Sequence, residues 1–261
     1  IDKRKAALDA LPEFEALRES AVAIKNHTLA HLDLYLDAYV AKVEASGGHV
    51  HFAEDAEHAR AIILKLCRDV GAKTVTKGKS MVTEEIALNQ HFEENGIVPV
   101  ETDLGEYIIQ LRGEHPSHII APAVHLTKEQ VEGDFRRVHT HLDVNRNLEE
   151  PVTLLNEARQ VLRQKYFEAD VGITGANFLI AETGTSVIVT NEGNGDLTQL
   201  LPKTHIVVAT IEKIVPTLSD MSQILRVLAR SATGQDMSVY TTLSTGPRRK
   251  GDVDGPENYH V

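Results

Sequence analysis

Apolar positions in the first part of the chain recur at helical spacing. Leu29, Leu32 and Leu36 fall on one face of a helix. Gly47-Gly48 then supplies a stop, because glycine tolerates the positive φ that ends many helices. The pattern predicts that residues 1–46 form an N-terminal helical arm.

Beyond the arm, short apolar runs alternate with longer stretches of helical periodicity. Asp55 is placed to cap the first of these helices, which ends at Gly71. Strand, helix and strand at such intervals are typical of βαβ units. The predicted strands span residues 50–52, 73–76, 97–100, 118–120, 177–182, 186–190, 205–211 and 239–243, and the predicted helices span about 55–70, 83–95, 104–111, 153–168 and 219–231.

This alternation predicts an α/β domain over residues 47–261, with a mostly parallel sheet and helices on both faces. The most apolar stretch, from Ile206 to Ile211, is far too short to span a bilayer. The chain begins at Ile1 without the apolar segment of a signal peptide. We therefore expect a cytoplasmic protein with no membrane span, and the start on Ile and the end at Val261 suggest a piece of a longer chain.

Charge and cysteine content narrow the function classes. The chain has 27 Lys and Arg against 38 Asp and Glu, a net charge of −11, which disfavours a nucleic-acid partner. The single cysteine, Cys67, excludes an internal disulfide framework and every multi-thiolate metal site. His49 and His51 would share one face of a strand, but no third ligand is evident nearby, so no metal is expected.

The segment Lys77-Gly78-Lys79-Ser80 lies between a predicted strand and a predicted helix. In doubly wound folds, ligands bind outside the carboxyl ends of the strands, where a helix N-terminus offers N–H groups to an anion. A complete phosphate-binding loop needs a glycine where this chain has Lys73, so that motif is incomplete. Lys77, Lys79 and Ser80 are candidate anion ligands, with solvated lysines on a surface turn as the alternative.

A second group of candidates flanks the strand predicted at residues 177–182. Glu182 has the chemistry of a general base or a nucleophile, because a carboxylate at the end of a sheet is easily desolvated. A plain hairpin turn, with Gly184 at positive φ, explains the same segment equally well. The candidate ligand-binding residues around this strand are Asn177, Thr183, Gly184, Asn191 and Glu192.

Two further candidates carry a titratable or cationic side chain. His205 belongs to a predicted strand, and a histidine near a strand end can donate a proton to a substrate. The alternative is a hydrogen-bonded histidine in the core. Arg248 lies in a tail rich in Gly and Pro, where its guanidinium can clamp a carboxylate or phosphate, and a solvated loop is the alternative. Together with the lysines, these residues favour a small carboxylate or phosphate as the ligand.

Several polar segments follow one another along the chain in a specific order. They are residues 77–85, 101–107, 116–119, 173–178, 181–184, 190–194, 231–235, 246–249 and 254–257. Taken together, they resemble the N-terminal LUD domain of the lactate utilisation protein B family, over essentially the whole chain. The resemblance implies an α/β fold of the NagB/RpiA/CoA-transferase type.

The resemblance also implies a function. Members of that family are iron–sulfur components of a multi-protein system that oxidises L-lactate to pyruvate without nicotinamide, so other subunits of that system are expected partners. A ferredoxin-like region with cysteine-rich cluster motifs would follow beyond residue 261. Iron–sulfur clusters are expected only in the full-length protein, and no cofactor is expected in this piece, because Cys67 alone cannot ligate a cluster.

Three functions stay open on the sequence. The first is the LUD domain of a lactate-oxidation subunit that binds a small anion or a partner subunit. The second is an autonomous enzyme of the CoA-transferase-like group that uses Glu182 as a covalent carboxylate. The third is a scaffold that only docks other proteins.

Overall fold

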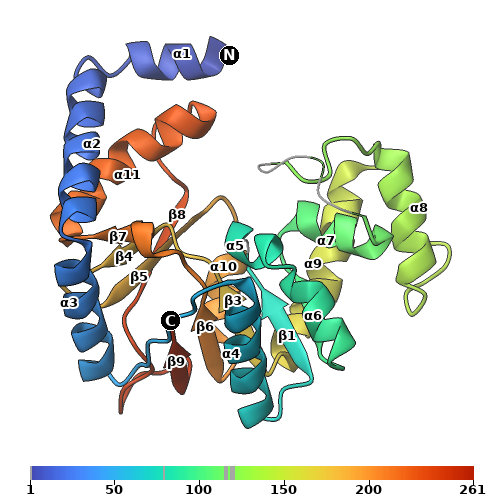
Figure 1. Ribbon diagram of the computed structural model, residues 1–261. Coiled ribbons are helices and arrows are strands. Elements are labelled where there is room, and N and C mark those ends of the chain that lie inside the picture. The colour runs from blue at the N-terminus through green and yellow to red at the C-terminus, as the bar shows by residue number, and fades with distance from the viewer. Residues whose placement is uncertain (1, 79, 115–116, 118–120) are drawn as a thin grey trace.

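The centre of the molecule is a sheet of five parallel strands (Figure 1). The computed structural model describes residues 2–78, 80–114, 117 and 121–261, so the strand predicted at residues 118–120 and the candidate Lys79 lie outside the described residues. In spatial order the strands are β2 (Val98–Glu101), β1 (Thr74–Lys77), β3 (Val171–Thr174), β6 (Thr204–Val207) and β9 (Asn258–His260).

Helices cover both faces of this sheet, which confirms the predicted fold class. On one face, α4 (Ala56–Asp69) and α6 (Leu88–Glu94) bury their apolar side chains against β1, β3 and β6. On the other face lie α9 (Pro151–Glu168) and α10 (Asn194–Leu200). Beyond β2, α7 (Leu104–Arg112) and α8 (Lys128–Val138) pack with α9 around a second apolar cluster. Within the described ranges, no helix combines the length and apolarity needed to cross a membrane.

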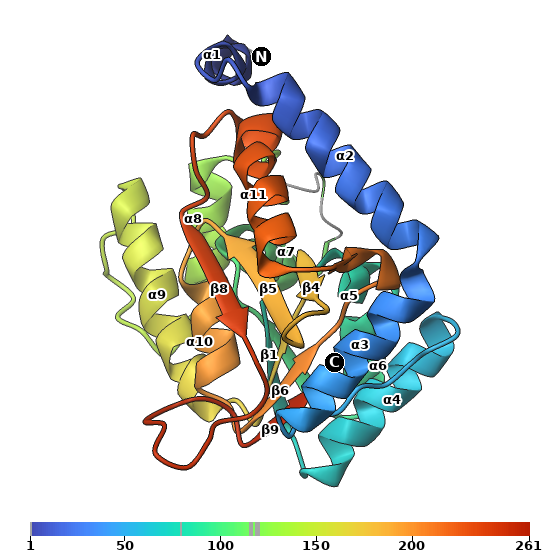
Figure 2. The same ribbon diagram turned by 90° about the vertical axis from the view of Figure 1, so that its left-hand side faces the viewer.

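A second, smaller sheet stands beside the first (Figure 2). Its strands, in spatial order, are β7 (Ile214–Val215), β4 (Phe178–Ile180), β5 (Thr185–Thr190) and β8 (Tyr240–Ser244). Its apolar side chains pack against α11 (Leu218–Thr233). The chain thus forms two sheets, and the prediction of strands near residues 177–182, 186–190 and 239–243 is confirmed.

The N-terminal arm consists of three helices rather than one. They are α1 (Asp2–Asp9), α2 (Phe14–Ala30) and α3 (Leu32–Ala45), and they are separated at residues 10–13 and at His31. The apolar face of α2 packs against α11 through Phe14, Ala21 and Val227. The arm is therefore part of the packed structure.

The structure corrects several predicted boundaries. The helix predicted at residues 83–95 is two helices, α5 (Met81–Glu85) and α6, because Ala87 adopts a left-handed φ of 51° between them. The predicted strand at residues 50–52 is irregular, and only His49 forms a bridge, to His260. The strand predicted at 205–211 ends at Val207, before the short 3₁₀ helix η1 (Ile211–Lys213). The sequence analysis missed β3, β7, β9, α8, α10 and η1.

Gly172 in the middle of β3 allows α10 to lie directly on the sheet. A Cβ atom at this position would stand 1.9 Å from the carbonyl oxygen of Thr198. No real contact is that short, so any side chain here would push α10 away from β3. The close approach of helix and sheet therefore depends on the absence of a side chain at residue 172.

We expect Gly172→Ala to lower the free energy of unfolding by about 3 kcal/mol, the upper part of the usual range for overpacking, because a clash with backbone cannot be relieved by a rotamer change. The matched control is Gly133→Ala on α8, where an added Cβ meets no atom within 4 Å. That change should stabilise the protein by about 0.5–1 kcal/mol through helix propensity. Urea unfolding of both variants measures the difference, and equal stabilities would contradict the proposed close approach.

Three histidines line up where β9 forms the edge of the parallel sheet. Residues 49–51 run alongside β9, and the rings of His49 and His51 both lie against the ring of His260, with centroids 5.2 and 5.3 Å away. The nitrogens His51 Nε2 and His260 Nδ1 are 3.1 Å apart. Burial and the neighbouring histidines lower the pKa of His260 to about 4, against a smaller opposing effect of Asp69. Burial, His49 and Lys65 also lower the pKa of His51.

A histidine whose pKa is lowered in the folded state stabilises the fold above its unfolded pKa of about 6.5. This contribution is lost as the pH falls toward 4, because the unfolded chain then binds more protons than the folded one. The melting temperature of the unaltered protein should therefore fall more steeply between pH 6.5 and pH 4 than that of His260→Gln. The control is His141→Gln, a change at an exposed position. If the melting temperature depends on pH in the same way for the unaltered protein, His260→Gln and His141→Gln, this account is refuted.

Candidate functional site

A cleft of about 710 Å³ lies beside the carboxyl ends of the parallel strands. In the spatial order β2-β1-β3-β6-β9, the chain first adds β2 on one side of β1 and then adds β3, β6 and β9 on the other side. The strand order therefore reverses between β1 and β3. Ligands of doubly wound sheets bind at this reversal, outside the carboxyl ends of the strands. The cleft wall includes Ser80 after β1, Asp103 after β2, Gly175 after β3 and Val208 after β6. The topology therefore makes this cleft the candidate functional site.

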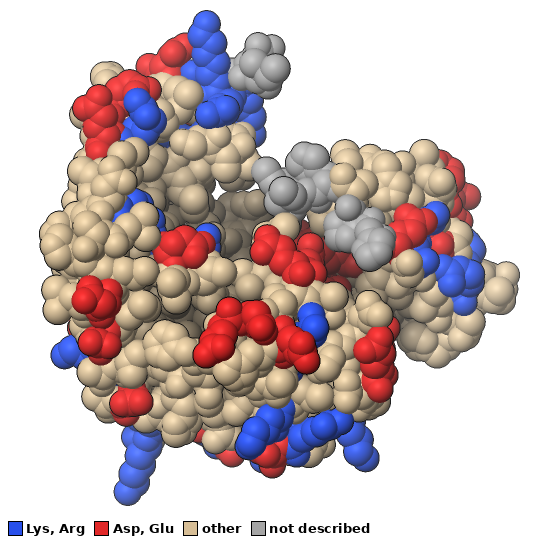
Figure 3. All heavy atoms as spheres, in the orientation of Figure 1, with Lys and Arg blue, Asp and Glu red and all other residues tan. Residues whose placement is uncertain are grey.

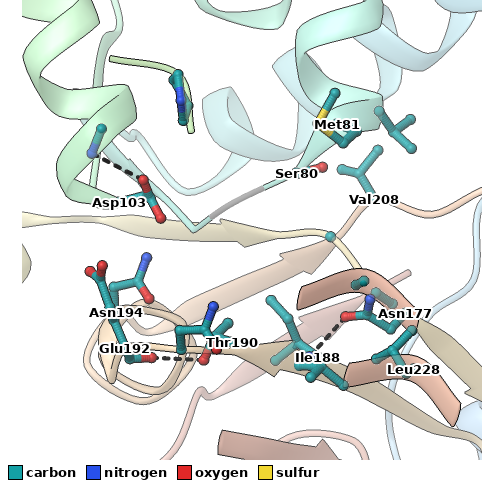
Figure 4. Close-up of a pocket in the computed structure, with 18 of the residues that line it drawn as sticks. Ser80, Met81, Asp103, Asn177, Ile188, Thr190, Glu192, Asn194, Val208 and Leu228 are labelled. Carbon is teal, nitrogen blue, oxygen red and sulfur yellow. Dashed lines mark hydrogen bonds between the residues drawn. The ribbon is translucent and has the colours of Figure 1, made fainter. Parts of the chain in front are cut away.

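The opposite wall comes from the second sheet and α11 (Figure 4). Strand β5 contributes Ile188 and Thr190, the first residue of α10 is Asn194, and α11 contributes Leu228. Figure 4 shows Met81, Val208 and Leu228 on one side of the cleft, and carboxylate, amide and hydroxyl groups at the opposite end. The cleft thus depends on how the two sheets are held together.

Four of the candidates from the sequence line this cleft: Ser80, Asn177, Asn191 and Glu192. Ser80 is the N-cap of α5, where its Oγ accepts a hydrogen bond from the Thr83 N–H. The Asn177 Oδ1 accepts a hydrogen bond of 2.8 Å from the Val189 N–H and so joins β4 to β5. Ser80 is far along the chain from Asn177, Asn191 and Glu192, and the fold brings them together.

Lys77 lies inside the molecule, away from the cleft lining. Its side chain is 2% exposed, and its Nζ donates to Glu101 Oε1 at 2.6 Å and to Asn89 Oδ1 at 2.8 Å. Lys77 and Glu101 are direct partners in the register of β1 and β2. The ammonium group therefore neutralises a buried carboxylate of this chain, and in this arrangement it is not available to a ligand.

Glu182, Thr183 and Gly184 form the turn between β4 and β5, outside the cleft lining. The exposed Glu182 accepts a hydrogen bond at Oε2 from the Leu218 N–H at the start of α11. Thr183 Oγ1 donates to Thr185 Oγ1. Gly184 has a φ of 69°, and a Cβ there would stand 2.6 Å from the backbone nitrogen of Val43 in α3. These contacts are those of a packed hairpin turn.

His205 and Arg248 lie near each other in a separate, smaller cavity of about 150 Å³. His205 is fully buried, its Nε2 is 2.9 Å from Thr174 Oγ1, and burial lowers its pKa to about 3. It is therefore a neutral imidazole at physiological pH. The exposed Arg248 donates from Nη2 to Glu257 Oε1 at 2.6 Å. The fold does not bring either residue to the cleft.

Acidic side chains dominate the described lining of the cleft. The described lining contains one cationic side chain, Lys213, and four acidic side chains: Glu85, Asp103, Glu192 and Glu212. Figure 3 shows the hollow in the middle of this face with acidic groups at its rim. The predicted small-anion ligand thus meets a negative field from the described residues.

Several polar residues of the cleft were not among the candidates from the sequence, and Asp103 and Asn194 are two of them. Asp103 caps α7, with Oδ1 accepting from the Gly105 N–H at 3.1 Å, and its position between a strand and a helix was a visible signal. Asn194 is buried at 7% exposure, and its Nδ2 has no hydrogen-bond partner. Helix α10 was not predicted, so Asn194 had no recognisable place in the fold.

The described residues were searched for side chains that could hold a metal ion together. Among them, no group of three or more His, Cys, Asp or Glu side chains is arranged to hold a metal ion. Cys67 lies fully buried in the core of α4, and burial raises the pKa of its thiol to about 12. Iron–sulfur clusters require several thiolates, which this chain does not provide.

The buried ion pair yields a test of the role of Lys77. We expect Lys77→Met to lower the free energy of unfolding by about 3–5 kcal/mol, because it leaves the Glu101 carboxylate buried without its cation. The double variant Lys77→Met/Glu101→Leu should recover most of the loss, since apolar replacements of both partners remove the uncompensated charge. Urea unfolding measures both. A nearly neutral effect of Lys77→Met alone would indicate that Lys77 is available to a ligand, as the sequence suggested.

Comparison with known proteins gives a consistent set of relatives. Lactate utilization protein B of Bacillus velezensis is 47% identical over 260 residues, which cover 99% of this chain and 54% of that protein. The protein of the same name from Geobacillus kaustophilus is 47% identical with the same coverage, and that from Bacillus subtilis (strain 168) is 46% identical over 99% of this chain and 53% of that protein. The chain spans about half the length of these curated relatives. No solved structure matches it.

The domain family described as the LUD domain matches residues 36–261. This match covers β1 to β9 and every described residue of the cleft. The chain therefore belongs to the LUD domain family.

Proposed function

We propose that this chain is the LUD domain of a protein that takes part in lactate utilisation, and that its cleft binds a small-molecule ligand of that process. The observation that carries the role is the identity of 47% over 99% of the chain to proteins named lactate utilization protein B. The cleft at the carboxyl ends of β1, β2, β3 and β6 supports the binding role, because ligands of such sheets bind there.

Electron transfer belongs, in this proposal, to sequence outside residues 1–261. The chain spans about half the length of its relatives, and its single thiol is buried in the core. Iron–sulfur clusters and the contacts with other subunits are therefore proposed for the full-length protein. The role of residues 1–261 is to bind and orient a ligand.

The geometry favours this role over an autonomous CoA-transferase. A covalent carboxylate must stand where the substrate binds, since it attacks the reacting carbon directly. The described cleft lining does not include Glu182, whose carboxylate instead caps the first amide of α11. A scaffold without a ligand is the remaining alternative, and the following experiment separates it from the proposal.

The test replaces the matching 260 residues of lactate utilization protein B in Bacillus subtilis with this chain, in a strain that lacks its own copy. We expect the hybrid to restore growth on L-lactate. A second hybrid carries Ala232→Trp, which places a large side chain in the cleft from an exposed position on α11. Because the indole fills the space of the ligand, this hybrid should fail to grow on L-lactate.

The control hybrid carries Ala41→Trp, the same change at an exposed position on α3 outside the cleft lining, and it should grow like the unaltered hybrid. Growth on glucose and immunoblots verify viability and protein level. Normal growth with Ala232→Trp would favour the scaffold. A hybrid that is present at the normal level but does not restore growth would overturn the role in lactate utilisation.

A further inference from the structure

A second cavity, of about 360 Å³, lies along α11, and its described lining shares no residue with the described lining of the cleft. Arg226 and Arg230 line it from successive turns of the helix, whereas Leu228 lines the cleft from the opposite side of the same helix. The rest of the wall includes residues 236–238, in the segment that joins α11 to β8 (Figure 2). The two cavities are therefore separate sites on either side of α11.

The two arginines of this cavity keep hydrogen-bond donors for a ligand. Among the described residues, Arg226 contacts only Glu13, through Nη2 at 3.1 Å. Arg230 uses Nη1 alone, which lies 2.6 Å from the Ala7 carbonyl oxygen and 3.0 Å from Asp236 Oδ1. A guanidinium carries five N–H donors on three nitrogens, so both side chains have donors to spare. Like charges four residues apart on a helix also repel one another, and an anion between them would relieve this repulsion.

A hydroxyl group in the same cavity is buried without a partner. The Oγ of Ser238 lines the cavity and makes no hydrogen bond to any described residue. Such groups are rare in folded proteins and call for an explanation. Ser222 and Thr241 add two further hydroxyl groups to the wall. Guanidinium and hydroxyl donors around one cavity are the chemistry that binds an oxyanion.

We propose that this cavity binds the phosphate group of a phosphate ester, with Arg226 and Arg230 donating to its oxygens and the Ser238 hydroxyl donating a further hydrogen bond. A phosphate group presents three acceptor oxygens and a charge of about −1.5 to −2, which matches two guanidinium groups better than the single charge of a carboxylate. A volume of about 360 Å³ lies within the usual range for small-molecule sites, so the cavity also has room for the organic part of the ester. Leu11 and Leu225 supply apolar wall for it. The inference does not depend on the proposed function, because it concerns a different cavity.

Two sources present such a group, a small ester such as a polyol phosphate and a nucleotide. Calorimetric titration of the full chain at constant ionic strength compares glycerol 3-phosphate with glycerol, and AMP with adenosine. We expect the phosphorylated member of at least one pair to bind at least tenfold more tightly than its partner, because charge-assisted hydrogen bonds to the arginines are lost without the phosphate. The pair that discriminates identifies the source, and equal discrimination within both pairs assigns recognition to the phosphate alone.

Arg226→Gln tests the site, because it removes one guanidinium from the wall and breaks only an exposed ion pair. We expect this variant to bind the phosphorylated compound at least tenfold more weakly and to unfold at nearly the same urea concentration. The matched control is Arg18→Gln on α2, which also removes one positive charge and one exposed ion pair, to Glu15, but lies outside the cavity lining. It should bind like the unaltered protein.

Ser238→Ala separates recognition from folding. Because the hydroxyl has no partner among the described residues, its removal should not lower the stability of the free protein. It should weaken binding of the phosphorylated compound by about 2- to 10-fold, the effect of one neutral hydrogen bond.

Four outcomes would overturn the phosphate site. They are equal binding within both pairs, no binding of any of the four compounds, undiminished discrimination by Arg226→Gln, and an equal loss of binding in Arg18→Gln and Arg226→Gln. None of them bears on the growth test. A hybrid that grows on L-lactate while the chain binds no phosphate ester refutes only this inference.

Discussion

The contact between α10 and β3 at Gly172 determines how the two halves of the cleft meet. Helix α10 lies on the parallel sheet at a distance that leaves no room for a Cβ, and the same helix begins with Asn194, directly after the loop that leaves β5. The second sheet is thereby joined to the first through backbone packing. Because backbone cannot rearrange as a side chain does, the separation of the two cleft walls is tightly constrained.

The elements that follow from sequence alone are those whose signals are local. Helix α4 has its Asp55 cap and its apolar face in one stretch, and it was predicted nearly to the residue. Strand β3 was missed because it is four residues long and buried on both faces, so it shows no alternation. The break between α5 and α6 depends on a left-handed φ at Ala87. Because this residue is not a glycine, the sequence gives no sign of the break.

The candidate site shows the same division between local and long-range information. Ser80 after β1 and Asn177 after β3 reach the cleft because parallel strands end at one edge. Asn191 and Glu192 reach it from the end of β5, in the second sheet. Lys77 was drawn instead into the ion pair with Glu101, a partner 24 residues away that only the strand register reveals. The acidic character of the described lining was equally hidden, because its four carboxylates come from four separate segments.

The packing of α2 on α11 has a consequence for what counts as the domain. The family match begins at residue 36, yet Phe14 and Ala21 of α2 bury Val227 on the helix that contributes Leu228 to the cleft. The packed structure therefore extends beyond the segment that the family match covers. Substitutions at Phe14 or Ala21 would therefore act on the cleft at a distance, through the position of α11, without altering any residue that lines it.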